Sequence, residues 1–202
     1  DFFSAIPQGI GAVVLRGVGE HFCAGLDLAE VIEKNRTPAE IIRHSRGWHR
    51  TFDLIQFGDV PVICCIQGGA IGGGLELAAA THIRVCESTA FFQLPEGQRG
   101  IFLGGGGSVR APRIIGTGRV VEMMLTGRRI EVDEGLRLGL AHYSTTSGGG
   151  LDKALEINPK QAAALRNRCV VRAVLGKDMA GALADCEAAI AVDGRKTEHL
   201  SN

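Results

Sequence analysis

Residues 68–77 have the sequence Gly-Gly-Ala-Ile-Gly-Gly-Gly-Leu-Glu-Leu, and they connect an apolar run at 60–66 to an alanine-rich run that ends near residue 80. We predict that the first run is a strand covered on both faces and that the second is a short helix. Glycines at such a turn let the backbone approach a ligand closely, and the first N–H groups of a helix have no acceptor within it. The stretch therefore predicts an α/β chain with amide donors that face an oxyanion.

Two acidic residues accompany this turn. Glu76 lies inside it, and Glu96 follows twenty residues later within Leu-Pro-Glu-Gly at 94–97. A lone glutamate is more often solvated, but the neighbours of Glu76 are apolar, so a charge there requires a reason. A second glycine-containing turn, His-Phe-Cys-Ala-Gly-Leu-Asp-Leu at 21–28, offers a further amide donor. Two carboxyl groups and two amides are sufficient for enolate chemistry, and carboxyls that share an apolar pocket predict a raised pKa for one of them.

The composition excludes several classes of protein. Lysine and arginine total 22 and are balanced by 22 aspartate and glutamate residues, so no basic surface for nucleic acid is indicated. The longest apolar runs are far shorter than the roughly 18 residues of a membrane-spanning helix. Six cysteines lack CxxC spacing and mostly have apolar neighbours, which is typical of buried thiols in a reducing compartment and predicts no metal site. We expect a soluble, cytoplasmic protein.

Strand and helix patterns alternate along the chain to about residue 140. Residues 37–40, Thr-Pro-Ala-Glu, combine an N-cap, a proline at the first helical position and a glutamate at the third, which predicts a helix to about Phe57. Strands are further expected at 11–15, 83–86 and 90–93, and helices at 28–34, after an N-cap at Ser108, at 119–125 and at 133–139. We predict that Trp48 packs in the core and that Arg128 and Arg129 lie in a solvated loop. The alternation places the chain in the α/β class.

From about Leu151 the chain becomes alanine-rich and loses its strand signals. Ala-Leu-Glu-Ile-Asn-Pro at 154–159 recurs as Ala-Ile-Ala-Val-Asp-Gly at 189–194. This spacing resembles a tetratricopeptide repeat, whose period is about 34 residues. Such helix pairs bury their faces only against neighbours, so we expect this tail to dock on the preceding domain or on a protein partner. The predicted domains are 1–147 and an all-α, helix-pair tail at 148–202.

Four motifs in order resemble the crotonase superfamily, the enoyl-CoA hydratases and isomerases. They are the turn at 21–28, Ala-Ile-Gly-Gly-Gly-Leu-Glu-Leu-Ala at 70–78, Leu-Pro-Glu-Gly at 94–97 and Met-Leu-Thr-Gly at 124–127. The resemblance covers about residues 1–145 and implies a spiral of ββα units. It also implies that a coenzyme A thioester is held between two backbone amides and that the protein forms a trimer or hexamer.

The resemblance assigns roles to individual residues. It implies oxyanion-hole amides at Leu26 and Gly73, and catalytic carboxyl groups at Glu76 and Glu96. In related hydratases the counterpart of Glu76 deprotonates water and the counterpart of Glu96 protonates carbon 2. The further substrate-binding positions that it implies are Ala24, Asp27, Gly72 and Gly104. Without the resemblance, Asp27 is more simply an aspartate that caps a helix start.

The activity that the resemblance implies is hydration of a trans-2-enoyl-CoA, with no metal and no cofactor apart from coenzyme A in the substrate. The sequence departs from typical members in three places. An N-terminal segment is absent, the C-terminal helices are replaced by the repeat-like tail, and a lysine near the coenzyme phosphates is Ala29. Isomerisation of an enoyl-CoA, hydrolysis of an acyl-CoA and an inactive, truncated remnant that acts as a binding or scaffold protein therefore remain open.

Overall fold

The computed structural model describes residues 2–27, 37–157, 180, 183–184 and 186–187 of the 202. The helix predicted at 28–34 and most of the predicted tail lie outside these residues. The strands are β1 (Val13–Arg16), β2 (Val62–Ile66), β3 (Gly69–Ile71), β4 (Ile83–Glu87), β5 (Phe91–Gln93), β6 (Arg129–Glu131) and β7 (Tyr143–Thr145). The helices are η1 (Phe2–Ser4), α2 (Pro38–Phe57), α3 (Gly73–Ala80), η2 (Glu96–Arg99), α4 (Gly107–Ile115), α5 (Thr117–Thr126), α6 (Val132–Leu138) and α7 (Gly150–Glu156), where η marks a 3-10 helix.

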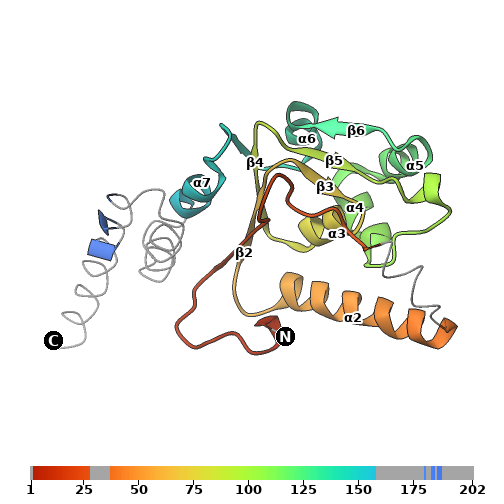
Figure 1. Ribbon diagram of the computed structural model, residues 1–202, viewed down its shortest axis with the longest axis horizontal. Helices are drawn as coiled ribbons and strands as arrows, with labels where there is room; N and C mark the ends of the chain where they lie inside the picture. The colour runs from red at the N-terminus through yellow and green to blue at the C-terminus, as the bar shows by residue number, and fades with distance from the viewer. Residues whose placement is uncertain (1, 28–36, 158–179, 181–182, 185, 188–202) are drawn as a thin grey trace.

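The strands form two sheets (Figure 1). The first sheet is parallel throughout and has the order β1-β2-β4-β7. In the second sheet, β3 pairs with β5 in parallel and β5 pairs with β6 in antiparallel orientation. Each of two successive units of the chain gives one strand to each sheet. The first unit is β2-β3-α3, and the second is β4-β5 followed by η2 and α4. The expected ββα arrangement of an α/β fold is therefore present.

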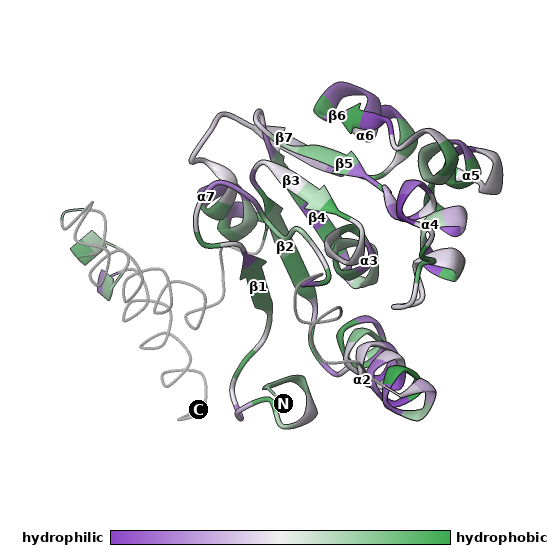
Figure 2. Ribbon diagram, turned by 45° about the vertical axis from the view of Figure 1, so that its right-hand side comes forward, coloured by the Kyte–Doolittle hydropathy of each residue, from purple (hydrophilic) through white to green (hydrophobic). Residues whose placement is uncertain are grey.

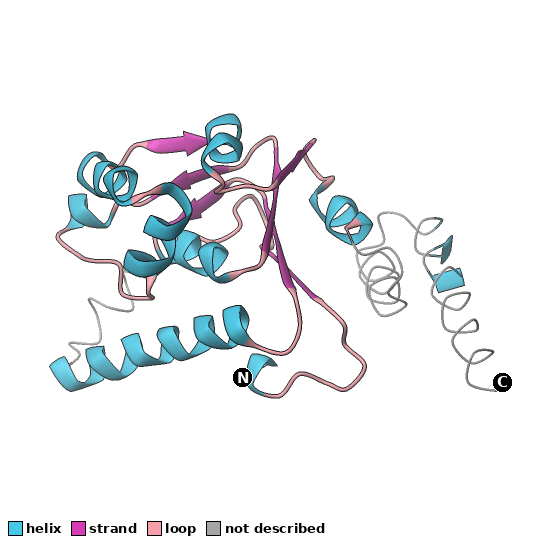
Figure 3. Cartoon of the chain, turned by 180° about the vertical axis from the view of Figure 1, so that it is seen from behind, coloured by secondary structure: helices cyan, strands magenta, loops and turns pink. Residues whose placement is uncertain are grey.

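Strand β2 is buried along its whole length and separates two apolar clusters. Ile63 and Cys65 pack with Ala154 of α7, whereas Cys64 and Ile66 belong to the larger core on the other face. Side chains alternate between the faces of a strand, so five consecutive apolar residues fit a strand with two covered faces. Figure 2 shows the hydrophobic colour of β2, and Figure 3 shows α7 on one side of this sheet and α2 and α3 on the other. The sequence prediction for this strand is confirmed.

Helix α2 begins and ends where the sequence predicts. The Thr37 hydroxyl accepts a hydrogen bond from the Glu40 N–H, and the Glu40 carboxylate accepts one from the Thr37 N–H, which completes a capping box. Phe52 and Ile55 are buried under the helix, and Trp48 packs against the same cluster. The prediction that Trp48 contributes to the core is confirmed, and the inner face of α2 borders the start of α3.

Two local predictions are wrong. Ser108 does not cap α4, because the helix already begins at Gly107, with Gly106 at the N-cap position and no side-chain cap. Arg128 does lie in the predicted loop, between α5 and β6, where its partly exposed guanidinium donates to Glu122 and Glu134, but Arg129 does not. Arg129 opens β6, and its guanidinium lies 4.2 Å from the centre of the Phe91 ring.

The cysteines follow the sequence prediction in the core only. Cys64, Cys65 and Cys86 are buried free thiols, and burial raises the pKa of each. Cys186, by contrast, is disulfide-bonded, so the expectation of free thiols fails at that position. Among the described residues, no group of three or more potential metal ligands gathers, and no described helix is both long and apolar enough to cross a membrane.

Candidate active site

The turn between β3 and α3 presents a backbone amide at the start of a helix. Gly72 has a φ of 54°, in the left-handed region that favours glycine, and its carbonyl accepts the N–H groups of Leu75 and Glu76. Gly73 is the first residue of α3, so its own N–H has no acceptor within the helix. The glycine run thus allows the chain to turn directly from strand to helix, and it leaves the Gly73 N–H available to a ligand.

A second segment of chain lies beside the Gly73 amide. The Ile71 N–H donates to the Cys23 carbonyl over 3.0 Å, which pairs the segment that contains Cys23 with β3. Gly25 has a φ of 88°, and a Cβ atom at this position would lie only 2.9 Å from the Gly73 nitrogen. The next residue, Leu26, lines the same pocket as Gly73. The two predicted amide positions therefore occupy adjacent segments at one pocket.

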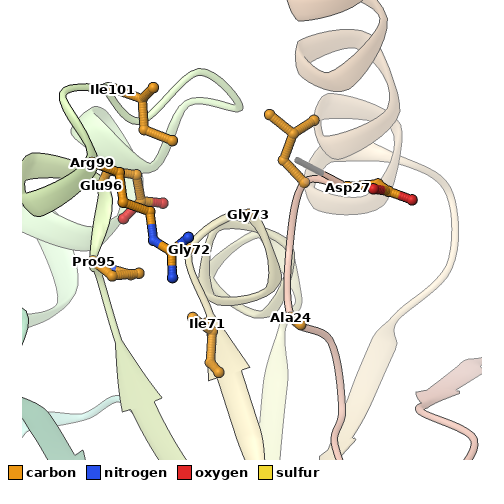
Figure 4. Close-up of a pocket in the computed structure, with 10 residues that line it drawn as sticks. Ala24, Asp27, Ile71, Gly72, Gly73, Pro95, Glu96, Arg99 and Ile101 are labelled. Atoms are coloured by element: carbon orange, nitrogen blue, oxygen red, sulfur yellow. The ribbon is translucent and has the colours of Figure 1, made fainter. Parts of the chain in front are cut away.

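This pocket has a volume of about 440 Å³ (Figure 4). Six of the eight sequence-predicted site residues line it: Ala24, Leu26, Asp27, Gly72, Gly73 and Glu96. Glu76 and Gly104 are not among the described residues that line it. Arg99 and Ile101 line the pocket as well, and the sequence reasoning missed both. In Figure 4 the residues of η2 stand on one side and Ala24 and Asp27 on the other, with Gly73 between them.

Glu96 is a buried acid at this pocket. Its side chain is 5 % exposed, and its Oε2 atom has no hydrogen-bond partner among the described residues. A Cβ atom at Gly72 would lie 2.6 Å from Glu96 Oε1, so the carboxyl group lies against the turn before α3. The pKa of Glu96 is raised to about 7, first by burial and then by the negative charge of Glu76, while a backbone hydrogen bond and the charge of Arg99 partly offset the rise. Near neutral pH this carboxyl group can both donate and accept a proton.

Glu76 is buried to the same degree but is held differently. Its Oε1 accepts hydrogen bonds from the Gly105 N–H over 2.9 Å and the Gly107 N–H over 2.7 Å. Burial raises the pKa of Glu76, and the bonds to Gly107 and Gly105 partly offset that rise. The sequence reasoning missed these two partners, although a glycine run at 104–107 was a signal for amides that approach a buried acid closely.

The matching family model, described as Enoyl-CoA hydratase/isomerase, covers residues 3–185. The chain belongs to the enoyl-CoA hydratase/isomerase family. It is 37% identical over 136 residues to the "Probable enoyl-CoA hydratase 2, mitochondrial" of Arabidopsis thaliana, and this match covers 67% of the chain and 44% of that relative. The chain therefore spans less than half the length of this enoyl-CoA hydratase relative.

Solved structures agree with this assignment to the enoyl-CoA hydratase/isomerase family. A structure from Rhodopseudomonas palustris is 44% identical, with a TM-score of 0.75 and coverage of 99% of this chain and 81% of that one. The enoyl-CoA hydratase of Bacillus anthracis is 30% identical, with a TM-score of 0.71 and coverage of 93% and 74%. The family model extends to residue 185, so it includes much of the region that we assigned to a separate tail. The helix-pair tail stays a prediction.

Two of the predicted substrate-binding residues of this enoyl-CoA hydratase/isomerase family member do not present a side chain to the pocket: Gly104 is not among its lining residues, and the carboxylate of Asp27 is turned aside. The Gly104 carbonyl accepts a hydrogen bond from Ser45 Oγ over 2.9 Å, which ties the glycine loop to α2. The Asp27 carboxylate points away from Gly73 in Figure 4. The expected helix after Asp27 lies outside the described residues, so its role as a helix cap stays a prediction.

Trp48 lies closer to the site of this family member than the sequence suggests. Its ring contacts the Phe52 ring at a centroid distance of 5.5 Å, edge to face. Both rings border a second hollow of about 260 Å³, next to Gly73 and Leu77. An apolar hollow beside the N-terminus of α3 can receive an apolar part of a ligand. Regular helical spacing in α2 predicted only a core position for Trp48.

Proposed function

We propose that this protein adds water to a trans-2-enoyl-CoA and forms the 3-hydroxyacyl-CoA. The thioester oxygen binds between the Leu26 and Gly73 amides, which stabilise the negative charge that develops on it in the transition state. Glu76 accepts a proton from water as the oxygen of that water bonds to carbon 3, and Glu96 donates its proton to carbon 2. The two carboxyl groups then exchange protons with solvent before the next turnover. Coenzyme A enters as part of the substrate.

The buried carboxyl group of Glu96 is the observation that carries this proposal. An acid with a pKa of about 7 is suited to proton transfer near neutral pH. The proposal is further supported by the unpaired Oε2 of Glu96 and by the position of its carboxyl group against Gly72, the residue before the proposed Gly73 amide. Membership of the enoyl-CoA hydratase/isomerase family supports a thioester as the substrate. Each amide of the oxyanion hole would contribute roughly 3 kcal/mol to transition-state stabilisation.

The decisive experiment is a hydration assay. The purified chain mixed with crotonyl-CoA should remove the absorbance of the conjugated enoyl thioester. We expect Glu96→Gln to lower kcat by at least about 100-fold, because the amide cannot donate a proton as an acid does. Glu156→Gln is the matched control, since Glu156 is an exposed residue that pairs with Lys153 far from the pocket.

Three outcomes separate the remaining alternatives. Full activity of Glu96→Gln would refute the assigned role. Release of free coenzyme A without hydration would indicate an acyl-CoA hydrolase instead. A chain that takes up no acyl-CoA in calorimetry and turns none over would be the inactive remnant with a binding or scaffold role.

A second candidate reaction is isomerisation of a 3-enoyl-CoA to the 2-enoyl-CoA. The position of Glu76 favours this reaction. Two backbone amides bind its Oε1 atom, and Glu76 is not among the described residues that line the pocket. Isomerisation moves a proton between carbons 2 and 4, and a single acid such as Glu96 is sufficient for that. Glu76→Gln should abolish hydration and leave isomerisation largely intact if both reactions occur.

A further inference from the structure

Arg99 introduces a positive charge into the pocket. It is the last residue of η2, three positions after Glu96, and it lines the 440 Å³ pocket together with Gly72 and Gly73. Figure 4 shows its guanidinium extending past Glu96 toward Gly72. The other residues of this pocket are apolar side chains, glycines and two acids. A cation is therefore directed at the region where we place the acyl thioester.

The guanidinium of Arg99 has no partner in the described part of the chain. Arg99 and Glu96 line the same pocket, and the charge of Arg99 partly offsets the rise in the pKa of Glu96, yet Glu96 Oε2 remains without a hydrogen bond to a described residue. No ion pair or side-chain hydrogen bond joins Arg99 to a described residue. The donors of Arg99 are consequently available to a ligand.

The two buried arginines of the described residues, Arg84 and Arg110, are matched with acceptors. Arg84 donates to the carbonyl oxygens of Thr81, Gly139 and Leu140. Arg110 donates to Asp53, Gln56 and the Gly105 carbonyl. These acceptors occupy the donors of both guanidinium groups. Arg99 differs because it is an exposed residue that borders a cavity, and no described residue supplies it with such a set of acceptors.

We propose that Arg99 binds a carboxylate carried by the acyl part of the substrate, so that the preferred substrates are acidic acyl-CoA thioesters. This inference rests on the proposed function, which supplies the thioester. A guanidinium presents paired N–H donors that match the two oxygens of a carboxylate. A neutral acyl chain would leave those donors without an acceptor. Arg99 is thus a specificity-determining residue that acts on substrate choice and performs no proton transfer.

Calorimetry with the full chain tests the proposal without requiring turnover. The probes are saturated thioesters in pairs of equal carbon number: glutaryl-CoA with pentanoyl-CoA, succinyl-CoA with butyryl-CoA, and malonyl-CoA with propionyl-CoA. We expect the acidic member of at least one pair to bind about fivefold more tightly, a factor typical of a partly exposed ion pair. The difference should shrink as sodium chloride is raised, because exposed charges are screened.

Variants of Arg99 make the test specific. Arg99→Gln should remove the preference for the acidic thioester and change the affinity for the neutral one by less than about twofold. Arg99→Lys should restore part of the preference, since it keeps the charge but loses the fork geometry. Arg113→Gln is the control, because Arg113 is an exposed residue of α4 outside the pocket.

Each adverse outcome has a separate meaning. Equal affinity for both members of every pair would overturn the inference and leave the proposed function standing. An equal loss for acidic and neutral thioesters in Arg99→Gln would also overturn it, because Arg99 would then contact the coenzyme. A chain that binds none of the thioesters would remove the proposed function and the inference together.

Discussion

The two buried acids, Glu76 and Glu96, differ in what surrounds their oxygens. Glu76 has an oxygen fixed by two amides of the glycine loop, whereas Glu96 has an oxygen without a described partner. Burial disfavours the ionised form of both acids, and backbone hydrogen bonds favour it, two from the glycine loop at Glu76 and one at Glu96. This difference is consistent with the proposed roles, in which Glu76 is the carboxylate that accepts a proton and Glu96 is the acid that donates one.

Glu96 should make the stability of the protein depend on pH. Its pKa rises from 4.5 to about 7 on folding, so the folded chain keeps this proton to higher pH than the unfolded chain does. The free energy of unfolding should therefore fall as pH increases from about 4.5 to about 7 and level off above that. Since one pKa unit corresponds to about 1.4 kcal/mol, the Glu96 contribution is about 3 kcal/mol. Urea denaturation between pH 4.5 and 8 measures it.

Glu96→Gln isolates this contribution, because the amide does not titrate. The variant should lose the part of the pH dependence that belongs to Glu96 and retain a smaller dependence in the same direction from Glu76, whose pKa is also raised. Glu156→Gln should behave like the original chain, since Glu156 is exposed. A variant Glu96→Gln with an unchanged pH dependence would show that Glu96 ionises normally in the folded protein.

At the scale of residues, sequence reasoning located the two acids and most of the pocket but not their partners. The apolar neighbours of Glu76 and the spacing to Glu96 were visible in the sequence. Gly105 and Gly107 were not identified as donors, because the direction of a backbone N–H depends on how the loop is folded over α3. Arg99 was missed because one arginine after a turn has the appearance of any solvated residue until the pocket beside it is known.

The glycine loop before α4 acts as an element that fixes Glu76. A Cβ atom at Gly107 would lie 2.6 Å from Glu76 Cγ and 2.8 Å from its Oε1. Contacts of that length force the carboxyl group to move. The loop is further tied to α2 through the bond from Ser45 to Gly104. The approach of this loop to α3 thus positions the base that we propose.

Gly107→Ala should therefore reduce catalysis more than folding. We expect kcat for crotonyl-CoA hydration to fall at least about tenfold, because a displaced base loses alignment with the substrate. Gly118→Ala is the matched control in α5, where nothing lies within 4 Å of the added Cβ atom. Circular dichroism should show both variants folded. Unchanged kcat in Gly107→Ala would mean that the position of Glu76 does not matter for turnover.

Elements with strong periodicity were predictable, and of the three-residue strands only β5 was expected from the sequence. The capping box and proline at residues 37–40 defined α2 correctly, and the run of buried residues defined β2. Strands β3, β6 and β7 have three residues each, too few to show alternation, and they exist because neighbouring strands supply their hydrogen bonds. Ser108 was a wrong cap because Gly106, with a φ of 94°, already starts the helix.

In the molecule as a whole, two buried charged residues of β4 fasten the segments before and after β7 to the first sheet. Glu87 of β4 accepts hydrogen bonds from the Gly148 N–H over 2.7 Å and the Gly150 N–H over 3.2 Å. Arg84 of the same strand binds the carbonyls of Gly139 and Leu140. Helix α7 consequently packs on the sheet opposite the pocket. The helix-pair tail, the homo-oligomer and a cytoplasmic location stay predictions, because the described residues do not test them.

The central claim is that the Leu26 and Gly73 amides hold a thioester oxygen opposite Glu96. A crystal structure of the Glu96→Gln variant with crotonyl-CoA tests it most directly, since the slow variant should retain unreacted substrate. We expect the thioester oxygen within about 3 Å of both amide nitrogens, with the side chain at position 96 beside carbon 2. A thioester oxygen turned away from either nitrogen, or an acyl chain bound outside this pocket, would rule out the proposed oxyanion hole.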